Sequence, residues 1–208
     1  LDFFASRPEL MCRGIDEPDQ LKPLMENADV IALGPGLGQS DWARHLWEAA
    51  IAFEGSLVID ADGLNWLAQL PAKRNDWILT PHPGEAARLL GTDTKAVQTD
   101  RQTAVHSLQE KYGGVAVLKG AGTLISDGSG PPALCRFGNP GMAAAGMGDV
   151  LTGLTAGLLA QTQDVLRSAR VGVLIHALAG DDASGDSERG LVAGDLMDWI
   201  RKWVNPKP

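Results

Sequence analysis

The chain of 208 residues is short of positive charge, cysteine and long apolar segments, and each shortage excludes a class of function. Its 18 Lys and Arg residues are outnumbered by 26 Asp and Glu, so the net charge of −8 leaves no basic surface for a nucleic-acid backbone. No apolar run approaches the roughly 18 residues of a membrane span, and the first residues lack the basic flank of a signal peptide. Cys12 and Cys135 form neither a disulfide framework nor a metal-ligand pattern. We expect a cytoplasmic protein that binds no nucleic acid, no membrane and no metal through a ligand cluster of its own.

Short apolar strands alternate with amphipathic helices along most of the chain. This alternation is typical of an α/β fold in which a mostly parallel sheet is covered by helices on both faces. We therefore expect a three-layer α/β/α sandwich and a single domain over residues 1–208. The expected strands are 29–33, 57–59, 77–79, 115–118, 123–126 and 133–137, the last two forming a hairpin. The expected helices are 41–53, 63–70, 85–90, 99–112, 150–160, 165–182 and 195–204.

Polar or glycine-rich clusters follow four of these strands, at residues 34–38, 60–63, 80–85 and 119–123. The carboxyl ends of parallel strands meet at one edge of a sheet, where α/β proteins bind their ligands. The sequence therefore predicts a ligand site built from these four loops.

The segment 138–153, GNPGMAAAGMGDVLTG, is the strongest functional signal. Glycines before a helix let backbone N–H groups approach an anion, and the N-terminus of the helix favours negative charge. Asp149 would face that anion, an unfavourable place for a carboxylate unless it takes the proton of an attacking hydroxyl. The segment thus indicates phosphoryl transfer, and the alternative is a glycine-rich turn capped by Asp149.

The remaining clusters each allow two interpretations. The loop GPGLG at 34–38 fits neither a dinucleotide fingerprint nor a Walker A loop, and is either a structural turn or a ligand contact. Asp60 and Asp62 either cap the following helix, which we favour, or lie near magnesium or substrate. Lys119 either holds a phosphate or is a surface side chain. His82 lies between two prolines without an apolar setting, so we favour ligand contact.

Together these strings resemble the ribokinase-like superfamily, and more narrowly the ADP-dependent NAD(P)H-hydrate dehydratases. The resemblance runs from about residue 28 to the last helix, and it rests on GPGLG, LVIDADGL, TPHPGEAARLL, VLKGAGT and GNPGMAAAGMGDVLTG. These lyases repair hydrated NADH and NADPH. They phosphorylate the hydroxyl on the nicotinamide ring with ADP and Mg²⁺, and phosphate then leaves by elimination. The same substrates and cofactors are implied for this chain.

The resemblance also implies a role for particular residues. Asp149 matches the catalytic residue that deprotonates the hydroxyl. The nucleotide would be bound by Lys119, Gly120, Ala121, Gly122, Thr123, Gly146 and Gly148. The hydrated dinucleotide would be bound by Gly36, Gly38, His82, Pro83, Gly84, Glu85 and Asp149. The remaining histidines, His45, His106 and His176, lie within expected helices and receive no functional role.

The sequence departs from the family at its start. The family's glycine-rich first strand–turn–helix unit has no counterpart here, and residues 1–7 read as the end of a strand without an initiator Met. We therefore expect a fragment of a longer chain, fused to or associated with an epimerase domain, that self-associates and is weakly active alone. The alternatives are a hydroxyethylthiazole-type kinase of the same superfamily, or a catalytically incomplete nucleotide-binding fragment. The string HPGE at 82–85 favours the dehydratase.

Overall fold

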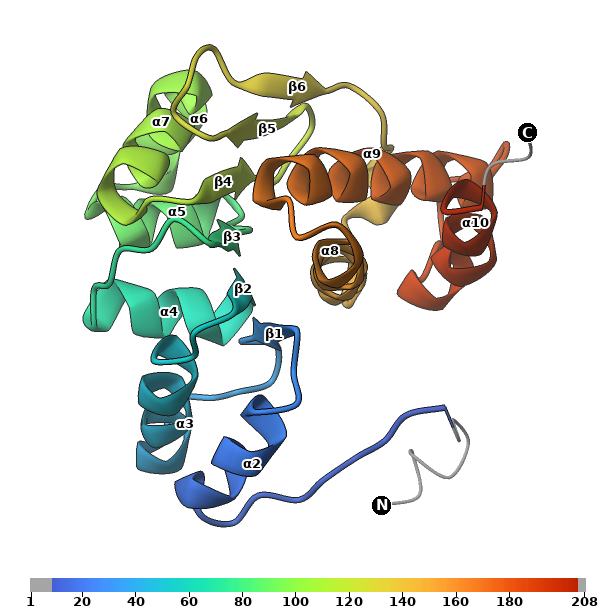
Figure 1. Ribbon diagram of the computed structural model, residues 1–208. Helices are drawn as coiled ribbons and strands as arrows, with labels where there is room; N and C mark the ends of the chain where they lie inside the picture. The colour runs from blue at the N-terminus through green and yellow to red at the C-terminus, as the bar shows by residue number, and fades with distance from the viewer. Residues whose placement is uncertain (1–8, 206–208) are drawn as a thin grey trace.

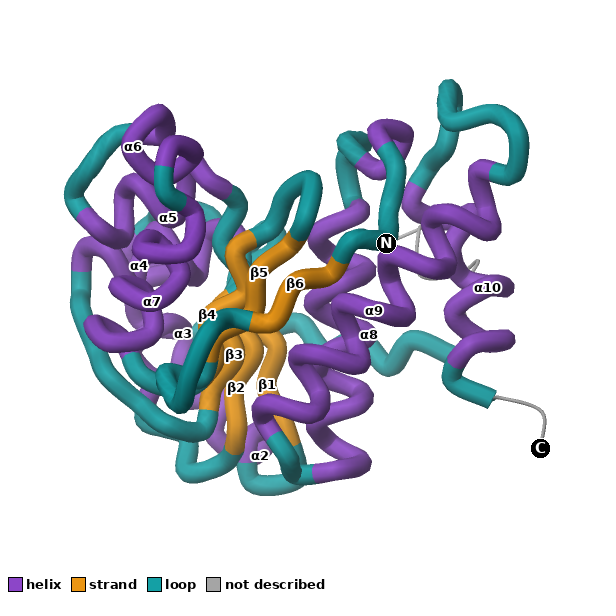
Figure 2. Tube along the Cα trace, turned by 90° about the horizontal axis from the view of Figure 1, so that it is seen from above, coloured by secondary structure: helices purple, strands orange, loops and turns teal. Residues whose placement is uncertain are grey.

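The computed structural model describes residues 9–205, so the expected strand end over residues 1–7 lies outside the described part. A central sheet separates two groups of helices, which confirms the three-layer arrangement (Figures 1 and 2). The strands lie side by side in the order in which they occur in the chain. They are β1 (Val30–Leu33), β2 (Ser56–Ile59), β3 (Trp77–Leu79), β4 (Val115–Leu118), β5 (Thr123–Ser126) and β6 (Ala133–Cys135).

Strands β1 to β4 pair in parallel, whereas β5 pairs antiparallel with both β4 and β6. The sheet is therefore mostly parallel, as predicted. The hairpin of β5 and β6 is also confirmed. Along β2, Leu57 and Ile59 face one helical layer and Val58 faces the other, because successive side chains of a strand point to opposite faces. Burial on both faces explains why the strands read as continuous apolar runs.

Helices from the first two-thirds of the chain cover one face of the sheet, and helices from the last third cover the other (Figure 2). The first group is α3 (Asp41–Ile51), α4 (Ala61–Gln69), α5 (Pro83–Leu90), α6 (Thr94–Thr99) and α7 (Arg101–Tyr112). The second group is α8 (Met147–Thr162), α9 (Val165–Ser184) and α10 (Leu196–Trp203), in which α10 packs on α9. The short helix α2 (Lys22–Met25), which the sequence did not reveal, precedes β1.

Several helix boundaries differ from the prediction by a few residues, and the starts of α5, α7 and α8 are the ones that bear on the site. The helix expected over 99–112 begins at Arg101, because Asp100 leaves helical geometry and caps α7 by accepting the N–H of Thr103. Residue 99 instead ends the short helix α6, which the sequence did not reveal. Helix α5 begins at Pro83 instead of residue 85, since proline is well tolerated at the first helical position. Helix α8 begins at Met147, three residues before the predicted start, and so includes Asp149 in its first turn.

Both cysteines are free thiols in the structure: Cys12 is exposed, and Cys135 is buried at the end of β6. Burial raises the pKa of the Cys135 thiol, which makes it a poor nucleophile. None of the helices between residues 9 and 205 combines the length and the apolar character needed to cross a membrane.

Candidate active site

The loops after β1, β2, β3 and β4 meet at one edge of the sheet, as the sequence predicts. Backbone hydrogen bonds join them: the Asp60 N–H donates to the Leu33 carbonyl at 3.1 Å, and the Lys119 N–H donates to the Pro81 carbonyl at 2.9 Å. The N-terminus of α8 reaches the same edge from the opposite layer, because the Thr152 hydroxyl donates to Asp60 Oδ2 at 2.8 Å. Segments far apart in the sequence therefore form one site.

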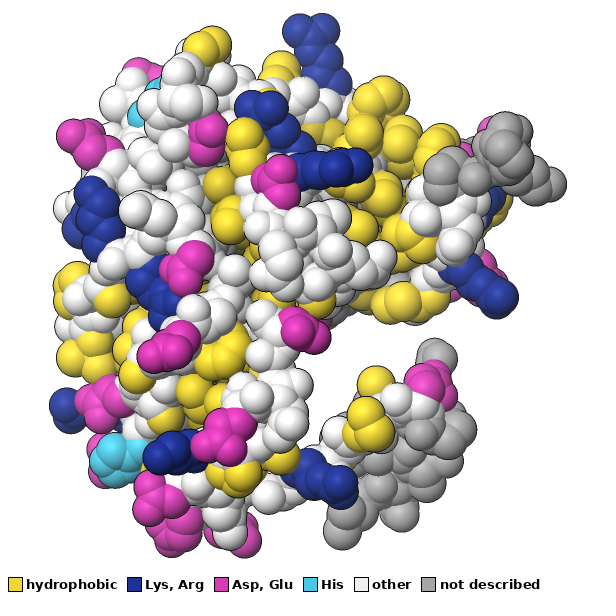
Figure 3. Space-filling view, in the orientation of Figure 1, with side chains coloured by type: hydrophobic (Ala, Val, Ile, Leu, Met, Phe, Trp, Pro, Cys, Tyr) yellow, Lys and Arg dark blue, Asp and Glu magenta, His cyan; other side chains and the backbone are white. Residues whose placement is uncertain are grey.

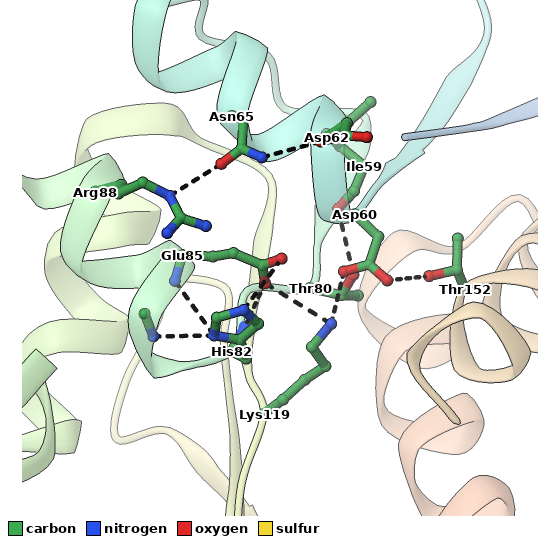
Figure 4. A network of polar contacts seen from close by, with 11 residues as sticks. Ile59, Asp60, Asp62, Asn65, Thr80, His82, Glu85, Arg88, Lys119 and Thr152 are labelled. Carbon is green, nitrogen blue, oxygen red and sulfur yellow. Dashed lines mark hydrogen bonds and ion pairs between the residues drawn. The ribbon is translucent and has the colours of Figure 1, made fainter. Parts of the chain in front are cut away.

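A buried ion pair lies at the centre of this edge (Figure 4). Asp60 Oδ1 accepts a hydrogen bond from Lys119 Nζ at 2.6 Å, with only 2% of the Asp60 side chain and 20% of the Lys119 side chain exposed. The same ammonium lies 3.9 Å from Glu85 Oε2. The expectation that Asp60 caps α4 was wrong: among the described residues its carboxylate makes no capping bond and serves the ion pair instead.

Asp62 does not cap α4 either. Its Oδ2 atom accepts the N–H of Gly38 at 2.8 Å, and its Oδ1 atom accepts the amide of Asn65 at 3.2 Å. The carbonyl of Gly38 in turn accepts the indole N–H of Trp66 at 2.9 Å. Both backbone groups of Gly38 are therefore bonded to α4, and the expected substrate residue Gly38 lies against that helix.

A cleft of about 410 Å³ opens between the loop after β1 and the first turns of α8. It is lined by Ala32, Leu33, Gly34, Pro35, Gly36, Leu37, Trp42, Asp149, Thr152 and Gly153. The cleft brings Gly36 and Asp149 together, as the substrate assignment requires. Trp42, from the first turn of α3, adds a partly exposed aromatic wall; the sequence had shown only that it belongs to a helix.

The loop after β1 needs glycine at its first position. Gly34 has a φ of +132°, and a Cβ there would lie 1.7 Å from the Asp60 carbonyl oxygen. The close approach of these two backbones lets the GPGLG loop lie beside the ion pair. The structural-turn interpretation of this loop is therefore confirmed. Contact with a ligand stays a prediction, and the position of Gly34, Gly36 and Leu37 in the lining of the cleft is compatible with it.

The N-terminus of α8 has the form of an anion site. Gly146 adopts left-handed geometry with φ 82° and has no side chain with which to cap the helix. By contrast, α3, α6, α7 and α9 are capped by Ser40, Asp93, Asp100 and Asp164. A Cβ on Gly148 would lie 3.4 Å from both Lys119 Nζ and Asp60 Oδ2, so bare backbone faces this pair. Free N–H groups, the helix dipole and a nearby ammonium all favour a phosphate here.

Arg101 holds the loop of residues 119–123 in place, and sequence reasoning missed it. Its Nη2 atom donates to the carbonyls of Leu118 at 3.2 Å, Lys119 at 3.4 Å and Gly122 at 3.2 Å. This loop includes Gly120, Ala121 and Thr123, expected to bind the nucleotide. An arginine that binds backbone carbonyls carries no motif, so nothing in the sequence distinguished it from a solvent-exposed side chain.

His82 caps α5. Its Nδ1 atom accepts the N–H of Gly84 at 3.0 Å, while Glu85 Oε2 accepts the N–H of His82 at 2.7 Å. The imidazole is about half exposed and can still reach a ligand, so the cap and a binding role are compatible. Burial raises the pKa of Glu85, and the Lys119 ammonium opposes part of that rise. Histidine is uncommon as a cap, which is why the sequence did not indicate this one.

The residues assembled here can support phosphoryl transfer. A phosphate at the N-terminus of α8 would lie beside Lys119, and a hydroxyl in the cleft would lie beside the exposed carboxylate of Asp149. These are the two halves of such a site, an anion cradle and a proton acceptor.

Comparison with known proteins agrees with this geometry. Residues 3–202 match the NAD(P)H-hydrate dehydratase family. The chain is 53% identical over 201 residues to the bifunctional NAD(P)H-hydrate repair enzyme of Coxiella burnetii, covering 96% of this chain and 41% of that protein. It thus spans less than half the length of this relative.

Two solved structures share the fold. A ribokinase-like superfamily protein from Enterococcus faecalis superposes with a TM-score of 0.84 at 31% identity, over 97% of this chain and 73% of that one. The ADP/ATP-dependent NAD(P)H-hydrate dehydratase of Bacillus subtilis, co-crystallised with ATP and Mg²⁺, gives a TM-score of 0.74 at 28% identity, over 85% and 64%. The ribokinase-like fold expected from the sequence is confirmed.

Proposed function

Because this chain belongs to the NAD(P)H-hydrate dehydratase family, we propose that it catalyses the ADP-dependent dehydration of hydrated NADH and NADPH. The observation that carries the proposal is the meeting of three features at one sheet edge. These are the cleft between Gly36 and Asp149, the open N-terminus of α8, and Lys119 beside Gly148. The cleft suits the hydrated nicotinamide ring, and the helix terminus suits the phosphates of the nucleotide.

In this proposal Asp149 accepts the proton of the ring hydroxyl as its oxygen bonds to the terminal phosphorus of ADP, and the bond from that phosphorus to AMP breaks. Backbone N–H groups of Gly146 and Gly148 and the ammonium of Lys119 stabilise the negative charge on the transferred group. The bond between the ring carbon and the phosphate oxygen then breaks and the adjacent ring carbon loses a proton, so that phosphate is eliminated and the double bond of the reduced ring is restored. Phosphorylation thereby replaces a poor leaving group with a good one.

The residues present fit a nucleotide and a magnesium ion. The exposed backbone of Gly148 leaves room for a phosphate beside Lys119. Among residues 9–205 no group of three or more His, Cys, Asp and Glu side chains is placed to hold a metal. Asp60 and Glu85 offer two carboxylates, which lie around the Lys119 ammonium. Mg²⁺ usually takes most of its ligands from water and substrate phosphates. When bound, Mg²⁺ would neutralise phosphate charge.

The decisive assay follows the absorbance of reduced nicotinamide after ADP is added to hydrated NADH or hydrated NADPH. The proposal predicts recovery of the band that depends on both ADP and protein. A stable phosphorylated product without recovery would indicate a kinase of the same superfamily instead. If ADP raises the melting temperature but neither product forms, the chain is a nucleotide-binding module.

Trp42→Ala tests the aromatic wall of the cleft. We expect the KM for hydrated NADH to rise about fivefold, since stacking on an indole contributes roughly 1 kcal/mol beyond simple burial. The affinity for ADP should not change. Trp203→Ala is the matched control, because Trp203 is 38% exposed against 40% for Trp42 but lies on α10. Equal KM values for the two variants would exclude Trp42 from the substrate site.

Gly148→Val tests the anion cradle. The added side chain would contact Lys119 Nζ and Asp60 Oδ2, so we expect the dissociation constant for ADP to rise at least about tenfold. Gly157→Val, in the same helix with nothing within 4 Å of its Cβ position, controls for the lower helix propensity of valine. Calorimetric titration with ADP measures both. Unchanged ADP binding in Gly148→Val would place the phosphate site elsewhere.

We further propose that the domain acts in the cytoplasm, that it is joined to or associated with an epimerase domain, and that it self-associates. The bifunctional name of the Coxiella burnetii relative supports the second point. Apolar side chains gathered over α9 and β6 support the third (Figure 3), with Leu134, Phe137 and Leu174 all more than one-third exposed. Light scattering of Phe137→Ser at increasing concentration tests this surface: a mass unchanged from the parent would exclude it.

A further inference from the structure

His176, on α9, contacts the first residue of α8. Its Nε2 atom lies 2.9 Å from the carbonyl oxygen of Met147 in a partly buried position. A carbonyl oxygen can only accept, so Nε2 carries the proton and the imidazole is the donor. Burial lowers the pKa of His176 to about 4, so the ring is uncharged near neutral pH.

The Met147 carbonyl shares its peptide unit with the N–H of Gly148. In a trans peptide these two groups point in opposite directions, so the bond to His176 helps to hold the Gly148 N–H in the direction that the first turn of α8 gives it. A hydrogen bond accepted by the carbonyl also polarises the amide and strengthens its N–H as a donor. This N–H lies in the open first turn of α8, and a Cβ on Gly148 would be 3.4 Å from Lys119 Nζ.

We propose that His176 is a positioning residue that orients the Gly148 N–H toward the phosphate of the bound nucleotide. This inference rests on the proposed function, because it takes the N-terminus of α8 as the phosphate site. His176 acts through Met147 and touches no ligand itself. The helix pair has other packing contacts, such as Gly172 against Thr155, so the hydrogen bond is separable from the packing of α8 on α9.

Three substitutions separate orientation from packing. His176→Leu fills the space without a donor. His176→Gln keeps an amide donor at a similar distance along the side chain, whereas His176→Asn carries the same amide on a chain that is too short. His106→Leu is the control, because His106 also makes a hydrogen bond, to the Ser126 hydroxyl, but lies on α7 away from α8.

Calorimetry compares the affinity for ADP with the affinity for adenosine, which has no phosphate. A change in packing alone would not weaken the binding of ADP selectively. We expect His176→Leu and His176→Asn to weaken ADP binding about tenfold and to leave adenosine binding unchanged, while His176→Gln retains most of the ADP affinity. His106→Leu should bind both ligands like the parent. If His176→Leu does not fold, the comparison of His176→Asn with His176→Gln carries the same test.

Three results would overturn the inference: ADP binding unchanged in His176→Asn, no rescue by His176→Gln, or parallel loss of ADP and adenosine binding. Each presupposes that the parent protein binds ADP. A parent protein that fails to bind ADP would instead contradict the proposed function, so the two failures are distinguishable.

Discussion

Asp149→Asn is expected to lower the turnover of hydrated NADH by a factor of about 10²–10⁴, the usual loss when a positioned base is removed. Asn retains the size and polarity of Asp but cannot accept the hydroxyl proton. The side chain of Asp149 is exposed and lines the cleft, so the fold should be unaffected. Binding of ADP should be retained, because the nucleotide phosphate contacts backbone N–H groups and Lys119 in the proposed site. Steady-state absorbance assays and calorimetry measure the two effects separately.

Asp198→Asn is the matched control, since Asp198 is also an exposed carboxylate in the first turn of a helix. It should leave turnover and ADP binding unchanged. Turnover by Asp149→Asn within a few-fold of the parent would remove Asp149 from the proton-transfer step. Loss of ADP binding in the same variant would move its role from chemistry to nucleotide binding.

Lys119→Met is expected to affect both stability and binding. Removing one partner of a buried ion pair leaves Asp60 uncompensated, which should lower the free energy of unfolding by roughly 3 kcal/mol. ADP binding should also fall, because the ammonium beside Gly148 is lost. Urea unfolding measures the first effect and calorimetry the second. Arg44→Met, which removes an exposed ion pair with Glu48, should change stability by only about 0.5 kcal/mol.

The double variant Lys119→Met/Asp60→Asn separates the two roles of Lys119. The substitution of Asp60 should restore much of the lost stability, since it removes the buried negative charge that Lys119→Met leaves unpaired. ADP binding should remain weak, because no ammonium faces the phosphate. Recovery of ADP binding together with stability would show that Lys119 is only structural. An unfolding free energy for Lys119→Met equal to that of the parent would instead contradict the structural role of the ion pair.

The fold could be predicted well from the sequence because its strands are short, continuously apolar and separated by strong turn signals. LVI at 57–59 and VAVL at 115–118 are apolar and buried at every position, as expected of strands in a sheet that is covered on both faces. Helix ends were less predictable, because they depend on single capping residues. Asp100 starts α7 two residues later than predicted, and the imidazole of His82 caps α5 in place of the usual small polar side chain.

The site was predicted in part. Glycine-rich loops indicate places where the backbone comes close to a ligand or to another segment. The meeting of Gly36, Lys119 and Gly148 at one edge of the sheet could therefore be expected from the motifs. The side chains that hold these loops could not. Arg101 and His176 donate to backbone carbonyls, and carbonyls are present at every residue, so no pattern of residue types records such a bond. The assignment of Asp60 to a helix cap failed because its partner, Lys119, is distant in the sequence.

The late position of α8 and α9 in the chain affects how the protein is made. Val58, Ile78 and Val117 are covered by Leu151 and Val173, which belong to these last helices. During synthesis the whole sheet therefore leaves the ribosome before its second face can be buried. At typical translation rates the delay is on the order of several seconds. An interrupted chain would display a bare apolar sheet to chaperones and proteases. Under the proposed function, a nascent chain would also be unable to bind ADP until α8 had docked.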